Sequence, residues 1–332
     1  MTKEIPLSVL ELALITEGSN TTQTFEKTKE LAQTADALGF NRFWLAEHHN
    51  MAHVASSATV VLIGYIAGQT RKIRVGSGGI MLPNHSPLII AEQFGTLETL
   101  YPNRIDLGLG RAPGTDTLTA TAIRKDFFEQ AKQFPQNVSA LQTYFSKENS
   151  TAAVRAFPGE GVKVPIWILG SSMDSAALAA AYGLPYAFAG HFAPKVMQEA
   201  FAFYRTHFNA SESLRQPKTM ACVNVIAADT TEEARVLSTS LYQMFLNLIR
   251  NNRQPLQPPV LALDEMMNET ERFHVDQMTA CTFIGDKDLL KKTLKAFIHT
   301  TQIDELMITS PVYDHTKKLK SLKITMEAMG ED

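Results

Sequence analysis

Five short segments of this 332-residue chain place histidine, arginine, serine or glycine residues directly after an apolar, β-rich run. They are Glu47–Asn50, Pro83–Pro87, Gly108–Gly114, Gly170–Ser172 and Ala189–Phe192. Each segment is a weak signal when it is taken alone. In barrel enzymes the strand ends meet at one mouth, and the active site lies there. Together the five segments predict one site that is built from several loops.

The segment Gly170–Ser172 opens a predicted helix and offers the chemistry of an anion site. Free backbone amides at a helix N-terminus, with the hydroxyls of Ser171 and Ser172 beside them, commonly bind a phosphate. Arg111 follows another strand and would supply the positive charge for such a group. Two simpler interpretations stay open: a serine that only caps its helix, and an arginine in a surface ion pair.

Gly78 and Gly79 lie inside a run that is otherwise typical of a strand, Ile73–Leu82. Glycine weakens a strand unless a group must approach the backbone closely or the peptide geometry is unusual. A planar ring stacked on this backbone is therefore one interpretation. A simple bend of the barrel is the other.

His48 is a candidate general base or acid, because imidazole changes its charge near neutral pH. His49 equally suits a structural role, and His85, between two prolines, equally suits the wall of a pocket. Glu47, His48 and His49 also resemble part of a metal site. Adjacent residues at a strand end point to opposite faces, however, so we expect no metal ion here.

No standard nucleotide or hydrolase motif is present. The segments Gly76–Met81 and Gly108–Pro113 both lack the third glycine of a dinucleotide-binding fingerprint. The chain has neither a P-loop nor a nucleophile elbow. Chemistry that depends on those motifs is therefore excluded.

The composition is that of a globular protein, with 45% hydrophobic and 20% charged residues. A net charge of -3 offers no basic surface for nucleic acid or for an acidic membrane. Two cysteines are too few for a disulfide framework, and no apolar run approaches the ~18 residues of a transmembrane helix. We expect a cytoplasmic enzyme that binds neither nucleic acid nor membrane.

Eight β-rich runs alternate with helical patterns, which is typical of a (β/α)8 TIM barrel. The strands are predicted at Pro6–Leu14, Arg42–Ala46, Ile73–Leu82, Ile105–Gly110, Pro165–Gly170, Tyr186–Ala189, Met220–Ala227 and Glu305–Thr309. The helices are predicted at Thr24–Leu38, Ser57–Gln69, Pro87–Leu100, Thr121–Phe145, Ser172–Tyr182, Pro194–Phe208, Thr231–Leu248, Asp288–Thr300 and Lys317–Met329. The alternative is an open doubly wound sheet, whose first strand needs a glycine-rich loop; Leu14–Thr22 has only one glycine.

Two stretches look like insertions into a single barrel domain of residues 1–332, at about 115–158 and 251–277. The first is polar and long for one connection. The second opens with three prolines in five residues, Pro255, Pro258 and Pro259, which exclude a regular helix or an inner strand. Such stretches near the mouth often act as lids or substrate walls.

With these residues in place, the sequence resembles the bacterial-luciferase-like flavin monooxygenase family. The resemblance runs roughly from Pro6 to Thr309 and is thin in the two insertions. It is carried by Phe43–Asn50 (FWLAEHHN), Arg74–Pro83, His85–Phe94, Arg104–Gly114, Pro165–Ser172 (PIWILGSS) and Gly183–Phe192. The AEHH and GRAPGTD segments resemble most closely a bacterial subgroup of uncharacterised members.

The resemblance implies a barrel that binds FMN at the C-terminal mouth of its strands. The histidine at His48 would assist the flavin–oxygen chemistry. The implied cofactor-binding residues are Ser77, Gly78, Gly79, Arg111, Gly170, Ser171 and Ser172. Of these, Arg111 and the two serines would hold the phosphate, and Gly78–Gly79 matches a non-prolyl cis peptide that packs against the flavin ring. Gly170 stands where the luciferase α subunit has an acidic residue, so phosphate contacts should differ in detail.

The resemblance further implies an FMN-dependent monooxygenase. Reduced FMN, made by a separate NAD(P)H reductase or by this chain, would react with O2 to a C4a-hydroperoxide that oxidises a small organic substrate. The alternatives are a flavin-binding carrier or sensor without catalysis, and a deazaflavin-dependent hydride-transfer oxidoreductase.

Members of this family usually form dimers, so we expect a homodimer. The helices implied at its interface are Ser57–Gln69 and Pro87–Leu100, both rich in Ile, Leu and Ala. The simpler alternative is that their apolar faces only cover the barrel.

Overall fold

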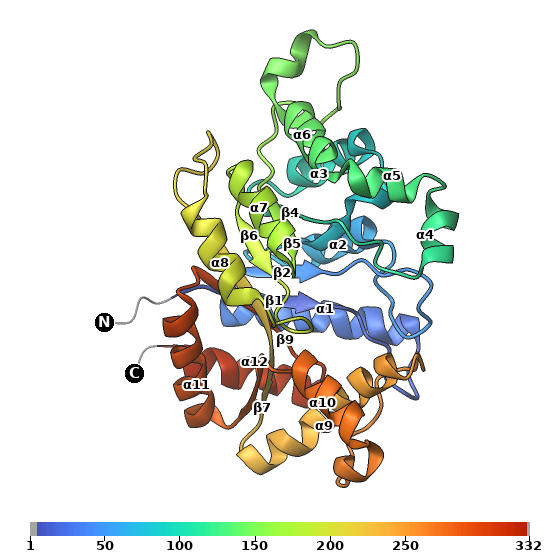
Figure 1. The fold of residues 1–332 in the computed structure, drawn as a ribbon, viewed down its shortest axis with the longest axis vertical. Helices are drawn as coiled ribbons and strands as arrows, with labels where there is room; N and C mark the ends of the chain where they lie inside the picture. The colour runs from blue at the N-terminus through green and yellow to red at the C-terminus, as the bar shows by residue number, and fades with distance from the viewer. Residues whose placement is uncertain (1–4, 331–332) are drawn as a thin grey trace.

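Eight parallel strands close into a barrel in the computed structural model, which describes residues 5–330 (Figure 1). The barrel strands are β1 (Leu7–Glu11), β2 (Arg42–Leu45), β3 (Arg74–Met81), β4 (Ile105–Gly110), β5 (Ile166–Gly170), β6 (Tyr186–Phe188), β7 (Thr219–Ala227) and β9 (Glu305–Thr309). They pair in chain order from β1 to β7; β7 then pairs with β9, and β9 with β1. The ring therefore has no free edge. The predicted (β/α)8 barrel is confirmed, and the open doubly wound sheet is wrong.

Helices surround the barrel, and at least one follows each barrel strand. Those that cover it are α1 (Thr21–Leu38), α2 (Thr59–Gln69), α3 (Pro87–Leu100), α7 (Met173–Ala181), α8 (Met197–Thr206), α9 (Thr231–Ile249), α11 (Lys287–Thr301) and α12 (His315–Met329). In α1, Asn20 and Gln23 form a capping box, and Gly39 ends the helix at a φ of 84°. Glycine adopts that conformation at little cost, so the predicted end of this helix is confirmed. No helix within residues 5–330 has the length and hydrophobicity needed to cross a membrane.

A ninth strand, β8 (Thr282–Gly285), lies outside the barrel and is not expected from the sequence. It pairs in parallel with the last four residues of β7, from Asn224 to Ala227. Because β7 has nine residues, its first half can pair with barrel strands while its second half pairs with β8. The four residues of β8 are mostly half-exposed, so they lack the apolar run by which the other strands are recognised.

The predicted helix Thr121–Phe145 is wrong, because three shorter helices occupy this part of the chain. They are α4 (Thr117–Ile123), α5 (Phe127–Lys132) and α6 (Phe134–Phe145). Asp116 caps α4, and Pro135 lies in the first turn of α6. A proline in a first turn loses no helical hydrogen bond, so it begins a new helix here.

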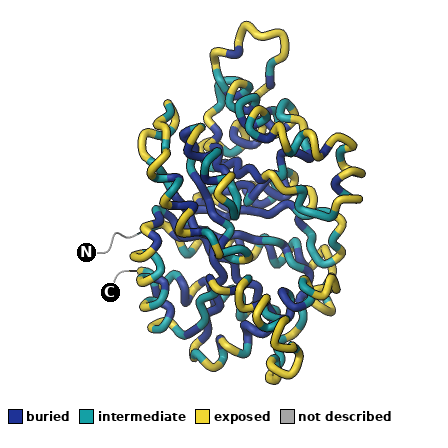
Figure 2. Tube along the Cα trace, in the orientation of Figure 1, coloured by how far each residue is buried: buried dark blue, intermediate teal, exposed yellow. Residues whose placement is uncertain are grey.

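The two insertion-like stretches differ in structure. Residues 115–158 contain α4 to α6 and the short η2 (Lys147–Thr151), and the chain after α6 projects from the body as a largely exposed loop (Figure 2). Residues 251–262 form no helix, as the prolines predict, and Leu256 makes a parallel bridge to Thr16. The short η3 (Leu263–Met266) follows, and then α10 (Glu269–Met278), which the sequence analysis does not predict.

The interior of the barrel is a packed core below the mouth. Its apolar cluster contains Leu10, Trp44, Ala46, Trp167, Ala187, Met220, Cys222 and Met307. At the N-terminal ends of the strands, the buried guanidinium of Arg42 pairs with Asp106 at 2.6 Å and with Glu305 at 2.8 Å. A ligand site must therefore lie at the opposite, C-terminal end, as in other barrels of this kind.

Candidate active site

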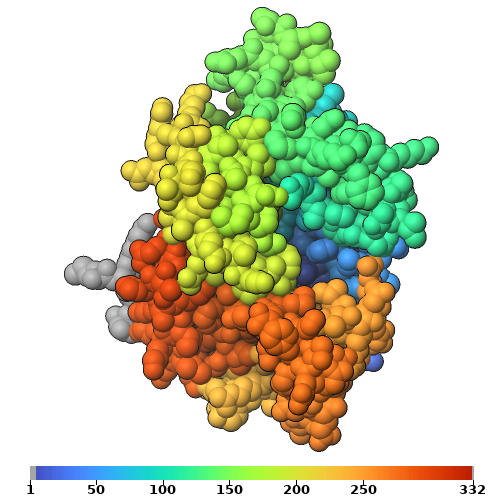
Figure 3. Space-filling model, viewed as in Figure 1, coloured from blue at the N-terminus to red at the C-terminus, as the bar shows by residue number. Residues whose placement is uncertain are grey.

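The surface is hollowed where the barrel strands end. Figure 3 shows this hollow between the green, yellow-green and orange segments, with blue N-terminal residues at its floor. The five segments selected in the sequence follow β2, β3, β4, β5 and β6. These strands are neighbours in the barrel, so the segments form one continuous arc, which we call the rim.

Glu47 joins the segments that follow β2 and β3. Its buried carboxylate accepts hydrogen bonds from Nε2 of His49 at 2.8 Å and from Nε2 of His85 at 2.9 Å. Nδ2 of Asn84 and the backbone N–H of Met81 also donate to it, each at 3.1 Å. Both histidines therefore belong to one hydrogen-bond network around Glu47, which for His49 is the structural role named above. The pocket-wall interpretation of His85 stays a prediction.

These hydrogen bonds keep Glu47 ionised. Burial raises its pKa, but the hydrogen bonds from His49, His85 and Asn84 outweigh burial and lower the pKa to about 2. Glu47 is therefore a carboxylate at neutral pH that positions its neighbours. Asn84 extends the connection to a third segment, because its amide also donates to the carbonyl of Pro113 at 3.0 Å.

His48 lies beside this network. Its Nδ1 is 3.3 Å from the carbonyl oxygen of Gly114, and its backbone N–H donates to the carbonyl of Ser56 at 3.2 Å. Burial lowers the pKa of His48 below its ordinary value of 6.5, although the contact with Gly114 and the charge of Glu47 act in the opposite direction. The ring is therefore neutral at pH 7, the form that accepts a proton.

Two further histidines, His53 and His191, lie close to His48. The Nδ1 atoms of both are buried and have no hydrogen-bond partner within the described part of the chain. Asn224 positions His191 by donating to its carbonyl at 2.7 Å, and burial lowers the pKa of His191 to about 3. Buried nitrogens without partners are uncommon, and at a rim they indicate polar space for a ligand.

The peptide bond between Gly78 and Gly79 is cis, the geometry that the resemblance implies at this place. A Cβ atom on Gly78 would lie 2.6 Å from the side chain of Leu10. On Gly79 it would lie 2.7 Å from the carbonyl oxygen of Gly108. Real Cβ atoms do not approach so closely, so a side chain at Gly79 would have to displace the backbone of β4, and one at Gly78 would require Leu10 to move.

Ser77 has a different environment from these glycines. Its side chain is fully buried, where its hydroxyl donates to the carbonyl of Gly108 at 2.8 Å and accepts from the N–H of Gly108 at 3.0 Å. The pairing of β3 with β4 shifts in register between Ser77 and Ile80. Ser77 therefore holds the two strands together at the irregular point.

Arg111 and the predicted serines come together where β4 and β5 end. Nη2 of Arg111 is 3.3 Å from the carboxylate of Asp174, which lies in the first turn of α7. Ser172 caps this helix by accepting a hydrogen bond from the N–H of Ser175, and Ser171 is half-exposed beside it. Both simpler interpretations, the cap and the surface ion pair, therefore describe contacts that are present.

Gly170 and Arg111 differ in how closely they are packed. A Cβ atom on Gly170 would lie 2.2 Å from Oγ of Ser175, so glycine is needed for the strand to approach α7. The pair of Arg111 and Asp174 is largely exposed, with side-chain exposures of 53% and 74%. An exposed pair stabilises little.

Cys222 and Cys281 are buried and free. Burial raises the pKa of both thiols, that of Cys281 to about 11. Neither is therefore a thiolate nucleophile at neutral pH. Within residues 5–330, no group of three or more His, Cys, Asp or Glu side chains is arranged to bind a metal ion.

Three polar residues at or beside the rim, Glu47, Asn84 and Asn224, position other groups, a role that the sequence analysis does not assign to them. Their partners are distant in the chain, with Glu47 and His85 38 positions apart and Asn224 and His191 33 positions apart. No local pattern indicates such a pair. The only signal in the sequence is that Glu47 and Asn84 follow predicted strands.

Comparison with known proteins shows a match to the luciferase-like monooxygenase family over residues 6–305. The chain is 50% identical to the uncharacterised protein YvbT of Bacillus subtilis (strain 168), over 97% of this chain and 96% of that protein. It is 45% identical to a luciferase-like monooxygenase of Escherichia coli (strain K12), over 99% and 98% of the two chains. The solved structure of apo-MsnO8 is 33% identical, with a TM-score of 0.91 and 98% of each chain covered.

More distant solved structures share the barrel. One is the oxygenating constituent of 3,6-diketocamphane monooxygenase from Pseudomonas putida in complex with FMN, at 18% identity, a TM-score of 0.72, and 98% and 97% coverage. Another is an F420-dependent secondary alcohol dehydrogenase, at 13% identity, a TM-score of 0.72, and 99% and 100% coverage. At these identities the likeness concerns the fold alone.

Proposed function

We propose that the flavin of this chain is FMN bound at the rim, and that the chain oxidises a small organic substrate with O2. The premise is that the chain belongs to the luciferase-like monooxygenase family and is a flavin-dependent monooxygenase. One observation carries the proposal. The rim holds the bare Gly78–Gly79 peptide, the neutral His48 and the cation Arg111 on neighbouring strand ends. The Gly78–Gly79 peptide suits the flavin ring, His48 suits its reactive edge, and Arg111 suits the phosphate of FMN.

The phosphate of FMN would bind where α7 begins. The backbone N–H groups of the first turn and the hydroxyl of Ser171 would donate to it, and the positive end of the helix favours its charge. Arg111 would exchange its exposed contact with Asp174 for the phosphate, because charge-assisted pairing with a dianion is the stronger interaction. Ser172 would continue to cap the helix, and Gly170 would keep β5 close to it.

The flavin ring would pack against the peptide of Gly78 and Gly79. Gly78 is half-exposed at the rim, whereas Gly79 is buried behind it. No side chain projects from this peptide, so a planar ring can approach the backbone. Ser77 would support the peptide from below by its two hydrogen bonds to Gly108, without touching the ring.

Reduced FMN, when bound, supplies the electrons that activate O2 and delivers the oxygen atom to the substrate. The side chains of this chain move the proton and exclude water. Donation from Nδ1 of His48 to the carbonyl of Gly114 leaves Nε2 without a proton, so Nε2 can accept one. The half-buried His48 and His191 would limit the access of bulk water to the reactive edge.

We expect reduced FMN to come from a separate NAD(P)H-dependent reductase. The chain has no dinucleotide-binding fingerprint with which to bind NAD(P)H in the usual way. A distant structural neighbour is itself described as an oxygenating constituent, which supports a division of labour of this kind. In a two-protein assay, oxidation should require the reductase, O2 and this chain together.

We also expect a homodimer formed through α2 and α3. Val61 on α2 is 70% exposed, and Ile89 and Leu100 on α3 are also exposed. Apolar side chains on adjacent helices are typical of an interface between subunits. Sedimentation velocity should show a dimer that Val61→Glu weakens, whereas Val154→Glu, on the exposed loop after α6, should leave it intact.

The deciding experiment titrates the purified protein with FMN, riboflavin and F420, each in its oxidised and reduced forms. Turnover is then tested with reduced FMN, 18O2 and a panel of small aldehydes, ketones and thioethers. We expect FMN to bind more tightly than riboflavin or F420, and one substrate class to acquire 18O. Preference for F420 would favour hydride transfer, and tight FMN binding without turnover would favour a carrier or sensor.

A further inference from the structure

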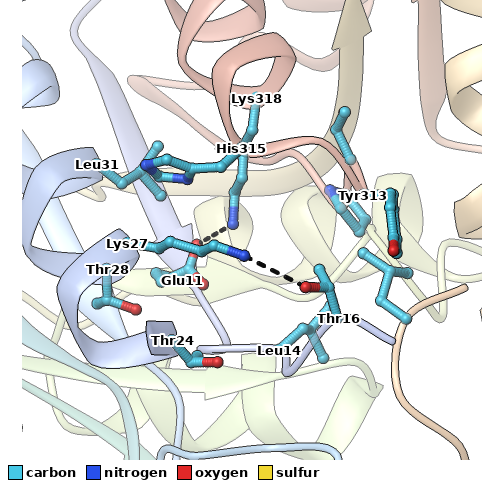
Figure 4. A pocket seen from close by; sticks show the side chains of 13 residues that line it. Glu11, Leu14, Thr16, Thr24, Lys27, Thr28, Leu31, Tyr313, His315 and Lys318 are labelled. Carbon is cyan, nitrogen blue, oxygen red and sulfur yellow. Dashed lines mark hydrogen bonds and ion pairs between the residues drawn. The ribbon is translucent and has the colours of Figure 1, made fainter. Parts of the chain in front are cut away.

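A second cavity lies away from the rim, between the first and the last helix of the barrel (Figure 4). Its walls come from the end of β1, from α1, from the start of α12 and from Leu256 of the proline-rich stretch. Its empty volume is about 390 Å³, a figure that includes space open to solvent. The enclosed part is much smaller, so a ligand must be small. We call it the α1–α12 pocket.

The charges around this pocket do not balance. Nζ of Lys318 is 2.6 Å from Oε2 of Glu11, and Oε1 of Glu11 accepts the N–H of Ala13 at 2.8 Å, so this buried pair is neutral. Nε2 of His315 is 3.0 Å from a carboxylate oxygen of Glu30. Among the described residues that line the pocket, Glu11 is the only acidic one, and Lys318 neutralises it.

Lys27 remains without a counter-charge. Its Nζ lies 3.4 Å from the hydroxyl of Thr16, and no carboxylate of the described residues forms an ion pair with it. Figure 4 shows this ammonium group directed into the middle of the pocket, toward Thr16. Thr28, the next residue of α1, adds a second hydroxyl to the lining. An uncompensated cation beside hydroxyl donors in a small, half-enclosed space is suited to an anion.

We propose that the α1–α12 pocket binds a small oxyanion, either inorganic phosphate or the carboxylate group of a small acid. Lys27 supplies the charge, and the hydroxyls of Thr16 and Thr28 donate hydrogen bonds. The ion pair of Lys318 and Glu11 forms the floor of the pocket and remains intact. This site is distinct from the start of α7, where Arg111 lies.

Binding here has a structural consequence for the stretch after α9. The backbone of Leu256 donates to Ile15 at 2.9 Å and accepts from Glu17 at 2.9 Å, on either side of Thr16. An anion held by Thr16 therefore stabilises the attachment of residues 251–262. The same stretch reaches α4 through Arg253, which is 3.6 Å from Asp116. Occupation of the pocket should therefore slow local opening of this stretch.

The test is isothermal titration of the Arg111→Ala variant with sodium phosphate and, separately, with sodium acetate, at constant ionic strength. The Arg111→Ala background removes the site that the proposed function assigns to the flavin phosphate, so the two proposals fail independently. We expect saturable binding of at least one anion. Tighter binding of phosphate would assign a phosphoryl ligand, and tighter binding of acetate would assign a carboxylate.

Matched variants on α1 locate the site. In the same background, Lys27→Gln should weaken the anion at least about tenfold, because a charge-assisted hydrogen bond is lost. Lys29→Gln, which removes an equal charge that pairs with Glu26 outside the pocket, should leave affinity within about twofold. Thr28→Val tests the lining without a change of charge and should also weaken binding.

Hydrogen–deuterium exchange supplies a second measurement. The saturating anion should slow exchange in residues 251–262 of the Arg111→Ala protein and should not do so after Lys27→Gln. The proposal is overturned if neither anion binds saturably up to about 10 mM, a very weak affinity. Equal affinity in the Lys27→Gln and Lys29→Gln proteins would overturn it as well.

Discussion

Nε2 of His85 lies 2.9 Å from Oε1 of Glu47, although the two residues are 38 positions apart in the chain. Nε2 of His49 approaches the same oxygen at 2.8 Å, so one carboxylate holds an imidazole from each of two strand ends. His48 stands between Glu47 and His49 in the sequence, and its backbone is therefore fixed on both sides. Glu47, which need not contact the substrate, thus positions His48, which we expect to act on the substrate.

Replacing Glu47 by Gln should destabilise the fold. The Gln side chain has nearly the shape of Glu, but the negative charge is lost and its NH2 group faces hydrogen-bond donors. Removing one partner of a buried charge network costs about 3–5 kcal/mol, and we expect a fall of about 3 kcal/mol in the free energy of unfolding, measured with urea. Glu26→Gln, which breaks only a surface pair with Lys29, is the control and should cost less than about 1 kcal/mol. Equal effects of the two substitutions would show that the network contributes nothing.

Acid should weaken the wild-type protein through the same carboxylate. Its pKa is about 2 in the folded chain against an ordinary 4.5, so the unfolded chain takes up the proton at higher pH. The contribution of Glu47 is complete above about pH 4.5 and is lost as pH falls toward 2, on the order of 3 kcal/mol in total. Urea unfolding between about pH 6 and pH 3 should show the advantage of wild type over Glu47→Gln shrinking with acid. A constant advantage across that range would contradict this assignment.

His48→Ala should leave FMN binding intact and abolish substrate oxidation. A positioned general acid or base contributes roughly 10²–10⁴-fold to a rate, and we expect a loss of that size. Because burial lowers the pKa of His48 below 6.5, wild-type activity should persist through pH 6.5 and fall only at lower pH. His299→Ala, on the exposed surface of α11, is the control. Undiminished turnover of His48→Ala, measured with reduced FMN and O2, would remove the residue from the mechanism.

Arg111→Ala should weaken FMN more than riboflavin, because riboflavin lacks the phosphate. Loss of a guanidinium–phosphate contact should raise the dissociation constant for FMN about tenfold or more, with riboflavin nearly unchanged. Asp174→Asn should act in the opposite direction, because it frees Arg111 and removes a carboxylate from the start of α7. Fluorescence titration with both flavins measures these effects, and Lys125→Ala, an exposed cation nearby in the chain, is the control. Equal weakening of the two flavins would exclude a phosphate contact.

Alanine at Gly79 should destabilise the fold more than alanine at Gly78. A Cβ on Gly79 meets the backbone oxygen of Gly108 at 2.7 Å, which cannot move without disturbing β4. A Cβ on Gly78 meets the flexible end of Leu10 at 2.6 Å, which can turn aside. We expect losses of about 3 and about 1 kcal/mol in the free energy of unfolding. The reverse order would mean that Leu10 is held more rigidly than β4.

The barrel could be predicted because its strands are buried on both faces and appear as short apolar runs. The end of α1 could be predicted because Gly39 takes a conformation that few other residues adopt. Neither signal exists for β8, whose residues are half-exposed. For α10 a local signal was present, since Asn268 and Glu271 form a capping box, but the prolines before it dominate the pattern.

Less of the candidate site could be predicted. Arg111 and Ser171 come near each other because β4 and β5 are neighbours, and this follows from the order of strands in a barrel. The hydrogen bonds of Glu47 and of Asn224 depend on where distant loops lie after folding, and no spacing in the chain encodes that position. The burial that makes His48 neutral is likewise a property of the assembled rim.

The strand β8 pairs only with the part of β7 that begins at Asn224, whereas β6 pairs with β7 only as far as Ala221. Leu256 attaches residues 251–281 to the segment after β1, and β8 attaches their far end to β7, and neither attachment uses a hydrogen bond between the barrel strands. We therefore expect insertions and deletions in this segment to leave the pairing of the barrel strands unchanged. On this expectation, relatives that share the barrel can differ in the length of this segment while the barrel folds in the same way.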